Sequence, residues 1–133
     1  MKIITHELPK YTDIEIYPVG DLHIGDKHHD KERVKELIEE IKEQENRYII
    51  LNGDIINNAT KHSVSDSYRE MLTPNEQIGE TVWLFESLKD RILCITEGNH
   101  EERSYRNDGI KIMYQVAQRL DIVKRYSEGA YLL

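Results

Sequence analysis

Polar side chains with metal-binding and proton-transfer chemistry follow three apolar runs of this sequence, at Gly20-Asp21-Leu22-His23, Gly53-Asp54 and Gly98-Asn99-His100-Glu101. Carboxylate oxygens and imidazole nitrogens together suit manganese, iron or zinc ions, and one carboxylate can bridge two such ions. A glycine before each polar residue lets the backbone turn sharply and approach an ion or a phosphate closely. The residue types therefore predict a site for divalent metal ions.

The spacing of these residues suggests a role for each. Asp21 and His23 lie two apart in an extended segment, so their side chains point the same way and can hold one ion. Asp54, alone after the middle run, is the natural bridge between two ions, and Asn99 offers a neutral oxygen to the second. His100 can donate a proton to a leaving group or hold a phosphate oxygen. We therefore predict catalytic roles for Asp54 and His100.

These residues can act together only if the fold brings them to one place. The runs at residues 14–19, 48–51 and 92–95 are rich in Ile, Val, Leu and Tyr and are typical of buried strands. Helical segments between them predict an α/β fold, a parallel βαβαβ sheet with flanking helices, in one domain over residues 1–133. Because the carboxyl ends of parallel strands share one edge, the polar groups should converge there.

Local signals predict where the helices begin. Asp30 is an N-cap for a helix whose apolar residues 34–41 share one face, and Thr73-Pro74-Asn75-Glu76 has the pattern of a capping box. A third helix is expected from Asp108, with Met113, Ala117 and Leu120 pointing inward. Residues 2–8 are expected to add an antiparallel strand.

In this order, and each after a buried strand, the three motifs resemble the first three motifs of the calcineurin-like metallophosphoesterases, over roughly residues 14–103. The resemblance implies a hydrolase that cuts phosphate mono- or diesters with a water activated by two divalent ions, Mn, Fe or Zn. It gives the ligands the roles described above and places His100 near the scissile phosphate, oriented by an acidic neighbour such as Glu101. Phosphatase, phosphodiesterase and nuclease activities remain open.

The family pattern continues with a lone His and a Gly-His-x-His motif, but no histidine follows His100. The sequence therefore predicts an N-terminal fragment, the first half of an α/β/β/α sandwich, with weak metal binding and little or no turnover of its own. We also expect self-association through an exposed sheet face. A non-catalytic α/β binding or interaction module that keeps a partial metal site is the alternative, whereas a Rossmann-like nucleotide-binding domain is disfavoured because its spaced glycines are missing.

Other polar residues near the motifs are weaker candidates. His28-His29 are expected in a surface loop and helix start rather than at the site, although they follow the first motif closely. Asn57-Asn58 and His62 fall in the loop after Asp54, where solvated positions are expected over a substrate pocket. Arg103 and Arg106 could bind a substrate phosphate or could be ordinary exposed arginines.

The composition of the chain limits the classes of molecule that it is expected to bind. Its net charge is -7 and it has no basic patch, so contact with nucleic acid or a nucleotide should depend on metal ions rather than on direct neutralisation of phosphates. The single cysteine, Cys94, lies in an apolar run and is expected in the core. Neither a signal peptide nor contact with a membrane is expected, which predicts a cytoplasmic location. The expected substrate is a phosphate ester.

Overall fold

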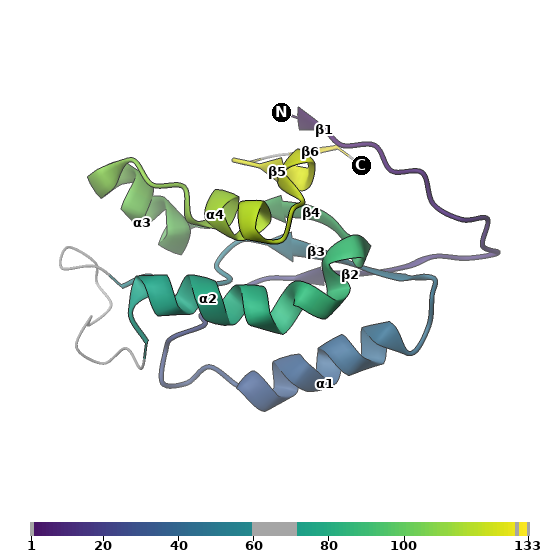
Figure 1. Cartoon of the computed structure of the whole chain (residues 1–133), viewed down its shortest axis with the longest axis horizontal. Coiled ribbons are helices and arrows are strands. Elements are labelled where there is room, and N and C mark those ends of the chain that lie inside the picture. The colour runs from purple at the N-terminus through teal and green to yellow at the C-terminus, as the bar shows by residue number, and fades with distance from the viewer. Residues whose placement is uncertain (1, 60–71, 130, 133) are drawn as a thin grey trace.

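A computed structural model describes residues 2–59, 72–129 and 131–132, and contains a four-stranded parallel sheet in the order β2-β3-β4-β5 (Figure 1). The strands are β2 (Glu15–Val19), β3 (Arg47–Asn52), β4 (Ile92–Thr96) and β5 (Tyr126–Ser127). The first three coincide with the predicted strands to within one residue at each end. The predicted parallel α/β sheet is therefore confirmed.

Among the described residues, four α-helices and two 3₁₀ segments connect the strands of the sheet. They are α1 (Lys31–Lys42), α2 (Pro74–Phe85), η2 (Glu86–Arg91), α3 (Asn99–Asp108), α4 (Ile112–Arg119) and η3 (Val123–Arg125). The first two helices begin where their caps predict: Asp30 accepts a hydrogen bond from the backbone N–H of Arg33, and Thr73 and Glu76 close a capping box. Local capping chemistry therefore sets the start of both helices.

The predicted start of the third helix is wrong, whereas the predicted burial of Met113, Ala117 and Leu120 is confirmed. Asp108 ends α3 rather than beginning a helix, and the inward-pointing Met113 and Ala117 belong to the next helix, α4. α3 starts at Asn99, so the third motif occupies its first turn. The sequence of α3 is almost entirely polar and shows no apolar period, which is why the usual helix pattern did not reveal it.

The main core lies between one face of the sheet and three helices. Buried apolar side chains of α1, α2 and α4 pack against β2, β3 and β4 in one cluster, which includes Ile41, Phe85 and Met113. Figure 1 shows these helices on the same side of the sheet. Because these helices cover one face of the sheet, the carboxyl ends of the strands lie at the border of the core. Polar side chains can line a cleft there.

The N-terminal segment does not form the predicted antiparallel strand. Instead β1 (Lys2–Ile3) pairs in parallel with β6 (Tyr131–Leu132) in a separate two-stranded sheet. Apolar side chains of the residues that follow β1 pack against the second face of the main sheet. The N-terminal segment therefore does not pair with an edge strand of that sheet. This smaller cluster comprises Ile4, Leu8, Tyr11, Tyr48, Ile50, Leu93 and Cys94.

Cys94 lies in this second cluster and is fully buried, as predicted. Burial raises the pKa of its thiol to about 11, so the thiolate is scarce at neutral pH and a nucleophilic role is disfavoured. On the same face Ile14 and Ile16 stay exposed, at 44% and 47%. Self-association through this face is untested and stays a prediction. None of the described helices is long and apolar enough to cross a lipid bilayer.

Candidate metal centre

The loops that carry the first and second motifs lie side by side beyond the ends of β2 and β3, joined by backbone hydrogen bonds. The Asp21 N–H donates to the carbonyl of Gly53 at 3.3 Å, and the His23 N–H donates to the carbonyl of Asp54 at 3.2 Å. A parallel bridge between Ile24 and Ile56 continues this pairing. The convergence predicted from parallel strands is therefore present, and the backbone itself fixes its register.

Glu101 ties the third motif to the second. Its buried carboxylate accepts hydrogen bonds from the backbone N–H groups of Asp54 at 3.0 Å, Ile56 at 2.9 Å and Gly98 at 2.9 Å. Burial raises the pKa of Glu101, and these N–H donors act in the opposite direction. The prediction that Glu101 orients His100 is wrong, because its carboxylate bonds to the loop backbone rather than to the imidazole.

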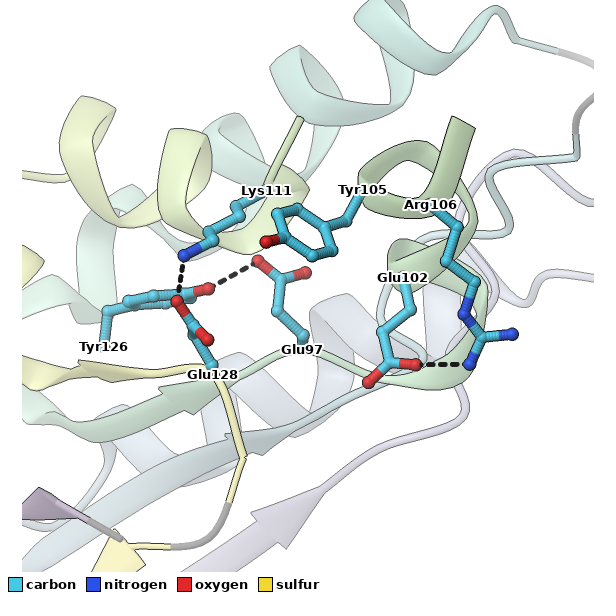
Figure 2. A pocket seen from close by; sticks show the side chains of 7 residues that line it. All are labelled: Glu97, Glu102, Tyr105, Arg106, Lys111, Tyr126 and Glu128. Atoms are coloured by element: carbon cyan, nitrogen blue, oxygen red, sulfur yellow. Dashed lines mark hydrogen bonds and ion pairs between the residues drawn. The ribbon is translucent and has the colours of Figure 1, made fainter. Parts of the chain in front are cut away.

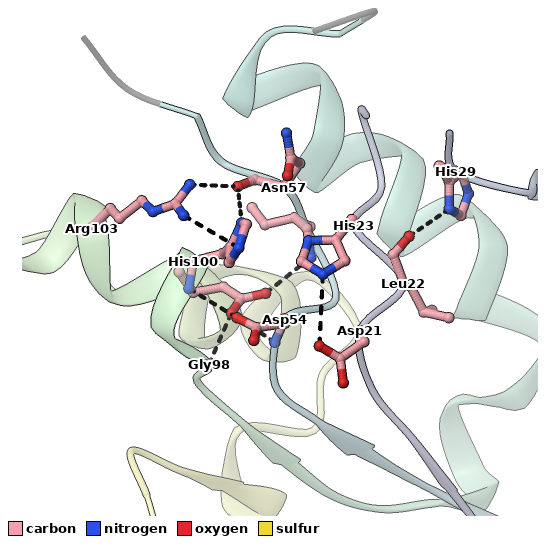
Figure 3. Close-up of polar contacts among 11 residues, drawn as sticks. Asp21, Leu22, His23, His29, Asp54, Asn57, Gly98, His100 and Arg103 are labelled. Atoms are coloured by element: carbon pink, nitrogen blue, oxygen red, sulfur yellow. Dashed lines mark hydrogen bonds and ion pairs between the residues drawn. The ribbon is translucent and has the colours of Figure 1, made fainter. Parts of the chain in front are cut away.

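The predicted ligands form two pairs in this arrangement (Figure 3). In the first, the Nε2 atom of His23 lies 3.6 Å from Oδ1 of Asp21, whose side chain is 84% exposed. In the second, the amide of Asn99 lies against the carboxylate of Asp54; with the nitrogen turned inward it donates to Oδ2 at 2.5 Å and to Oδ1 at 2.9 Å. A half-turn of this amide would present its oxygen instead, the atom that a metal ion binds.

Three of the four predicted ligands have strained backbones. Asp21, His23 and Asp54 have φ values of 52°, 48° and 50°, and Asn58, in the same loop as Asp54, has 47°. Asp, Asn and His are the side chains that enter the left-handed region most readily, at a cost on the order of 1 kcal/mol each. Such strain concentrates at functional sites, where the surrounding structure holds it.

The donor types of the two pairs fit divalent ions. Each pair contains a carboxylate, with an imidazole in one and an amide in the other, which is a mixture that Mn, Fe and Zn accept. Two ligands that each lie about 2.1 Å from one ion can stand as far apart as Asp21 and His23. Among the described residues, no three His, Cys, Asp or Glu side chains group closely enough to hold an ion. The agreement between this site and divalent metal ions therefore depends on the two donor pairs.

His100 lies beside the first pair, with its ring 4.4 Å from that of His23, centroid to centroid. Its Nδ1 atom is 2.7 Å from the carbonyl oxygen of Asn57, which can only accept, so Nδ1 carries a proton. Its Nε2 atom is 3.2 Å from Nη2 of Arg103, a group that can only donate. The neutral Nδ1–H form of His100 satisfies both contacts.

Asn57 and Asn58 were expected at solvated positions, but the structure places them beside the third motif. Both are buried, at 3% and 0% exposure. The side chain of Asn58 donates to the carbonyl of His100 at 2.8 Å and to Oγ of Ser104 at 3.0 Å, which fixes the first turn of α3. The tolerance of asparagine for positive φ is the one local signal that could have indicated a structured turn here.

The motifs border a cleft of 360 Å³ whose lining residues come mainly from the first loop. They are Asp21, Leu22, His23, Asp26, His28, His29, Asn57 and His100. His28 and His29 thus line the cleft, which was the less favoured alternative. The Nδ1 atom of His29 lies 2.8 Å from the carbonyl of Leu22, and its buried Nε2 atom has no partner among the described residues. His62 falls outside the residues that the structure describes.

The two candidate arginines of α3 separate in space. Arg103 reaches His100 at the cleft, whereas Arg106 bonds to Glu102 at 2.9 Å beside a different cavity of 280 Å³ (Figure 2). In that cavity Glu97 accepts hydrogen bonds from the N–H groups that open α4 and from the hydroxyl of Tyr126. Glu97 therefore serves to cap a helix there, and of the two arginines Arg103 is the one that contacts a residue of the candidate site.

Replacing Gly98 by alanine is expected to lower the free energy of unfolding by about 2 to 3 kcal/mol. A Cβ atom on Gly98 would lie 2.1 Å from the backbone nitrogen of Asp54 and 2.4 Å from its Oδ1 atom, so the two loops would have to move apart. Urea unfolding followed by circular dichroism measures the change.

Gly79→Ala is the matched control, because Gly79 lies inside α2 and a Cβ atom there meets nothing within 4 Å. It should raise the free energy of unfolding by about 0.5 to 1 kcal/mol. Equal effects of the two substitutions would contradict the close approach at Gly98.

Comparison with models of known protein families matches residues 19–131 to the family described as calcineurin-like phosphoesterase. The match covers β3, β4 and β5, the four described α-helices and all three motifs, and begins at the last residue of β2. Searches of curated proteins and of solved structures found no match.

Proposed function

Because the chain belongs to the calcineurin-like phosphoesterase family, we propose that it hydrolyses phosphate mono- or diesters with two divalent metal ions held by Asp21, His23, Asp54 and Asn99. The observation that carries this proposal is the convergence of two donor pairs at one edge of the sheet. One pair is Asp21 with His23 and the other is Asp54 with Asn99. Both lie within the matched region.

Each side chain has a distinct task in this proposal. Bound divalent ions would neutralise the phosphate and activate a water molecule. Asp54 lies at the first turn of α3, where its Oδ1 atom accepts the His100 N–H at 2.8 Å, so one carboxylate oxygen is anchored while the group faces the amide of Asn99. That anchorage fixes the carboxylate that would lie between the two ions.

His100 is the proposed partner of the leaving group or of a phosphate oxygen. Its Nδ1–H is held by the carbonyl of Asn57, so Nε2 is the atom available to substrate. To donate from Nε2 the ring must carry a second proton, and the resulting cation would complement an anionic phosphate. The hydrogen bond from Nδ1 orients the ring for this exchange.

Manganese titration tests the proposal. Electron paramagnetic resonance should detect Mn²⁺ binding, and hydrolysis of bis(4-nitrophenyl) phosphate or 4-nitrophenyl phosphate should appear with Mn²⁺, disappear with EDTA and return when Mn²⁺ is restored. Binding without hydrolysis of either ester would favour the non-catalytic module with a partial metal site. Neither binding nor hydrolysis would contradict both readings.

A further inference from the structure

We propose that Arg103 is the residue that binds the substrate phosphate, and that in the substrate-free site its guanidinium occupies the phosphate position beside His100. This inference rests on the proposed function, which supplies the phosphate ester. It assigns a substrate-binding role to a residue outside the three motifs.

The position of Arg103 follows from the geometry of α3. It lies three residues after His100, so both side chains share one face of the helix. Its Nη2 atom is 3.2 Å from Nε2 of His100, and its Nη1 atom is 3.4 Å from the carbonyl oxygen of Asn57. The guanidinium therefore lies against His100 and Asn57, two of the residues that line the cleft (Figure 3).

The chemistry of these contacts favours exchange with phosphate. The contact with Asn57 is to a neutral carbonyl oxygen and is long for an N–H to oxygen bond. A guanidinium bonds more strongly to a phosphate oxyanion, which accepts two parallel N–H bonds in the geometry of the fork. When Arg103 turns to the phosphate, Nε2 of His100 loses this donor and can bond to the substrate instead.

The charges around the cleft call for such a cation. Asp21 and Asp54 contribute carboxylates, and Asp26 lines the same cleft, so an anionic ester meets negative charge on the protein side. A guanidinium beside the metal ions would offset part of this repulsion. Arg106 cannot take this place, because it bonds to Glu102 beside the other cavity.

The test compares Arg103→Ala, Arg103→Lys and Arg106→Ala with the unmodified protein. Isothermal titration calorimetry of the Mn²⁺-loaded proteins with inorganic phosphate should show an affinity about 10- to 100-fold lower in Arg103→Ala, the loss expected for a hydrogen bond between charged groups. Arg103→Lys should recover part of it, and Arg106→Ala should match the unmodified protein. In hydrolysis of 4-nitrophenyl phosphate, Arg103→Ala should raise KM more than it lowers kcat.

Mn²⁺ affinity and circular dichroism separate phosphate binding from a structural effect, and both should stay the same in all variants. If Arg103→Ala does not fold, Arg103→Lys carries the test, with a smaller but measurable loss of phosphate affinity. Unchanged phosphate affinity in the Arg103 variants, in a protein that hydrolyses esters, would overturn this inference and leave the proposed function intact. Failure of the unmodified protein to bind Mn²⁺ and hydrolyse esters would overturn both.

Discussion

Replacement of Asp54 by asparagine is expected to lower Mn²⁺-dependent hydrolysis of bis(4-nitrophenyl) phosphate by at least about 100-fold. The carboxylate of Asp54 contacts the amide of Asn99 and accepts the N–H of His100 in the first turn of α3. Asparagine keeps the size of the side chain and can still accept from the His100 N–H, but it removes the charge that would bridge two cations. The ratio kcat/KM and the Mn²⁺ affinity measure the effect.

Asp26→Asn is the matched control for this substitution. Asp26 lines the cleft that His23 and His100 also line, and its carboxylate accepts only a local bond from the His28 N–H at 2.7 Å among the interactions described for it. The same loss of charge there should change kcat/KM by less than about threefold, the scale of an exposed charge in solvent. Equal losses in both variants would mean that general electrostatics, rather than bridging, explains the effect.

Replacement of Glu101 by alanine is expected to lower the free energy of unfolding by about 3 to 5 kcal/mol, because it would remove the acceptor of one buried and two partly buried backbone N–H groups. Those groups belong to Asp54, Ile56 and Gly98, so the second and third motifs would also lose their connection. Urea unfolding measures the loss of stability, and Mn²⁺ affinity should fall with it.

Glu102→Ala provides the comparison at the next position. Its side chain is 45% exposed and pairs with Arg106 one turn along α3, an arrangement worth about 0.5 kcal/mol or less. Both substitutions remove the same group from the same helix turn, so helix propensity cancels between them. A small effect of Glu101→Ala, similar to that of Glu102→Ala, would show that the loops hold together without the buried carboxylate.

The parts of the fold that the sequence predicts are those with local signals. The three central strands are continuous apolar runs, and the capping box at Thr73 and Glu76 is built from residues that contact each other within one turn. The metal ligands also followed from local order, since each comes directly after a strand and parallel strands end at one edge. Their convergence needed no knowledge of long-range contacts.

The features that the sequence did not reveal depend on long-range contacts. α3 begins at a glycine with no capping side chain of its own; the Asp54 carboxylate, from another loop, accepts the His100 N–H at its first turn. Glu101 follows His100 directly in sequence, yet adjacent residues of a helix point in different directions, so its partners lie in the loop after β3. Asn57 contacts His100 through its backbone carbonyl oxygen, a group that every residue carries, so the sequence could not indicate this contact.

The hydrogen bonds that join the three motif loops link the site to the folding reaction. Parallel neighbours are never adjacent in the chain, so each loop meets the next only after a helical crossover has formed. No two of the three motifs can therefore assemble in a partly folded chain that lacks the intervening helix. An ion that binds the assembled site stabilises the native state alone, by about 2.7 kcal/mol at a concentration 100 times its dissociation constant. The melting temperature of the protein then becomes a reporter of ligand occupancy that requires no knowledge of the substrate.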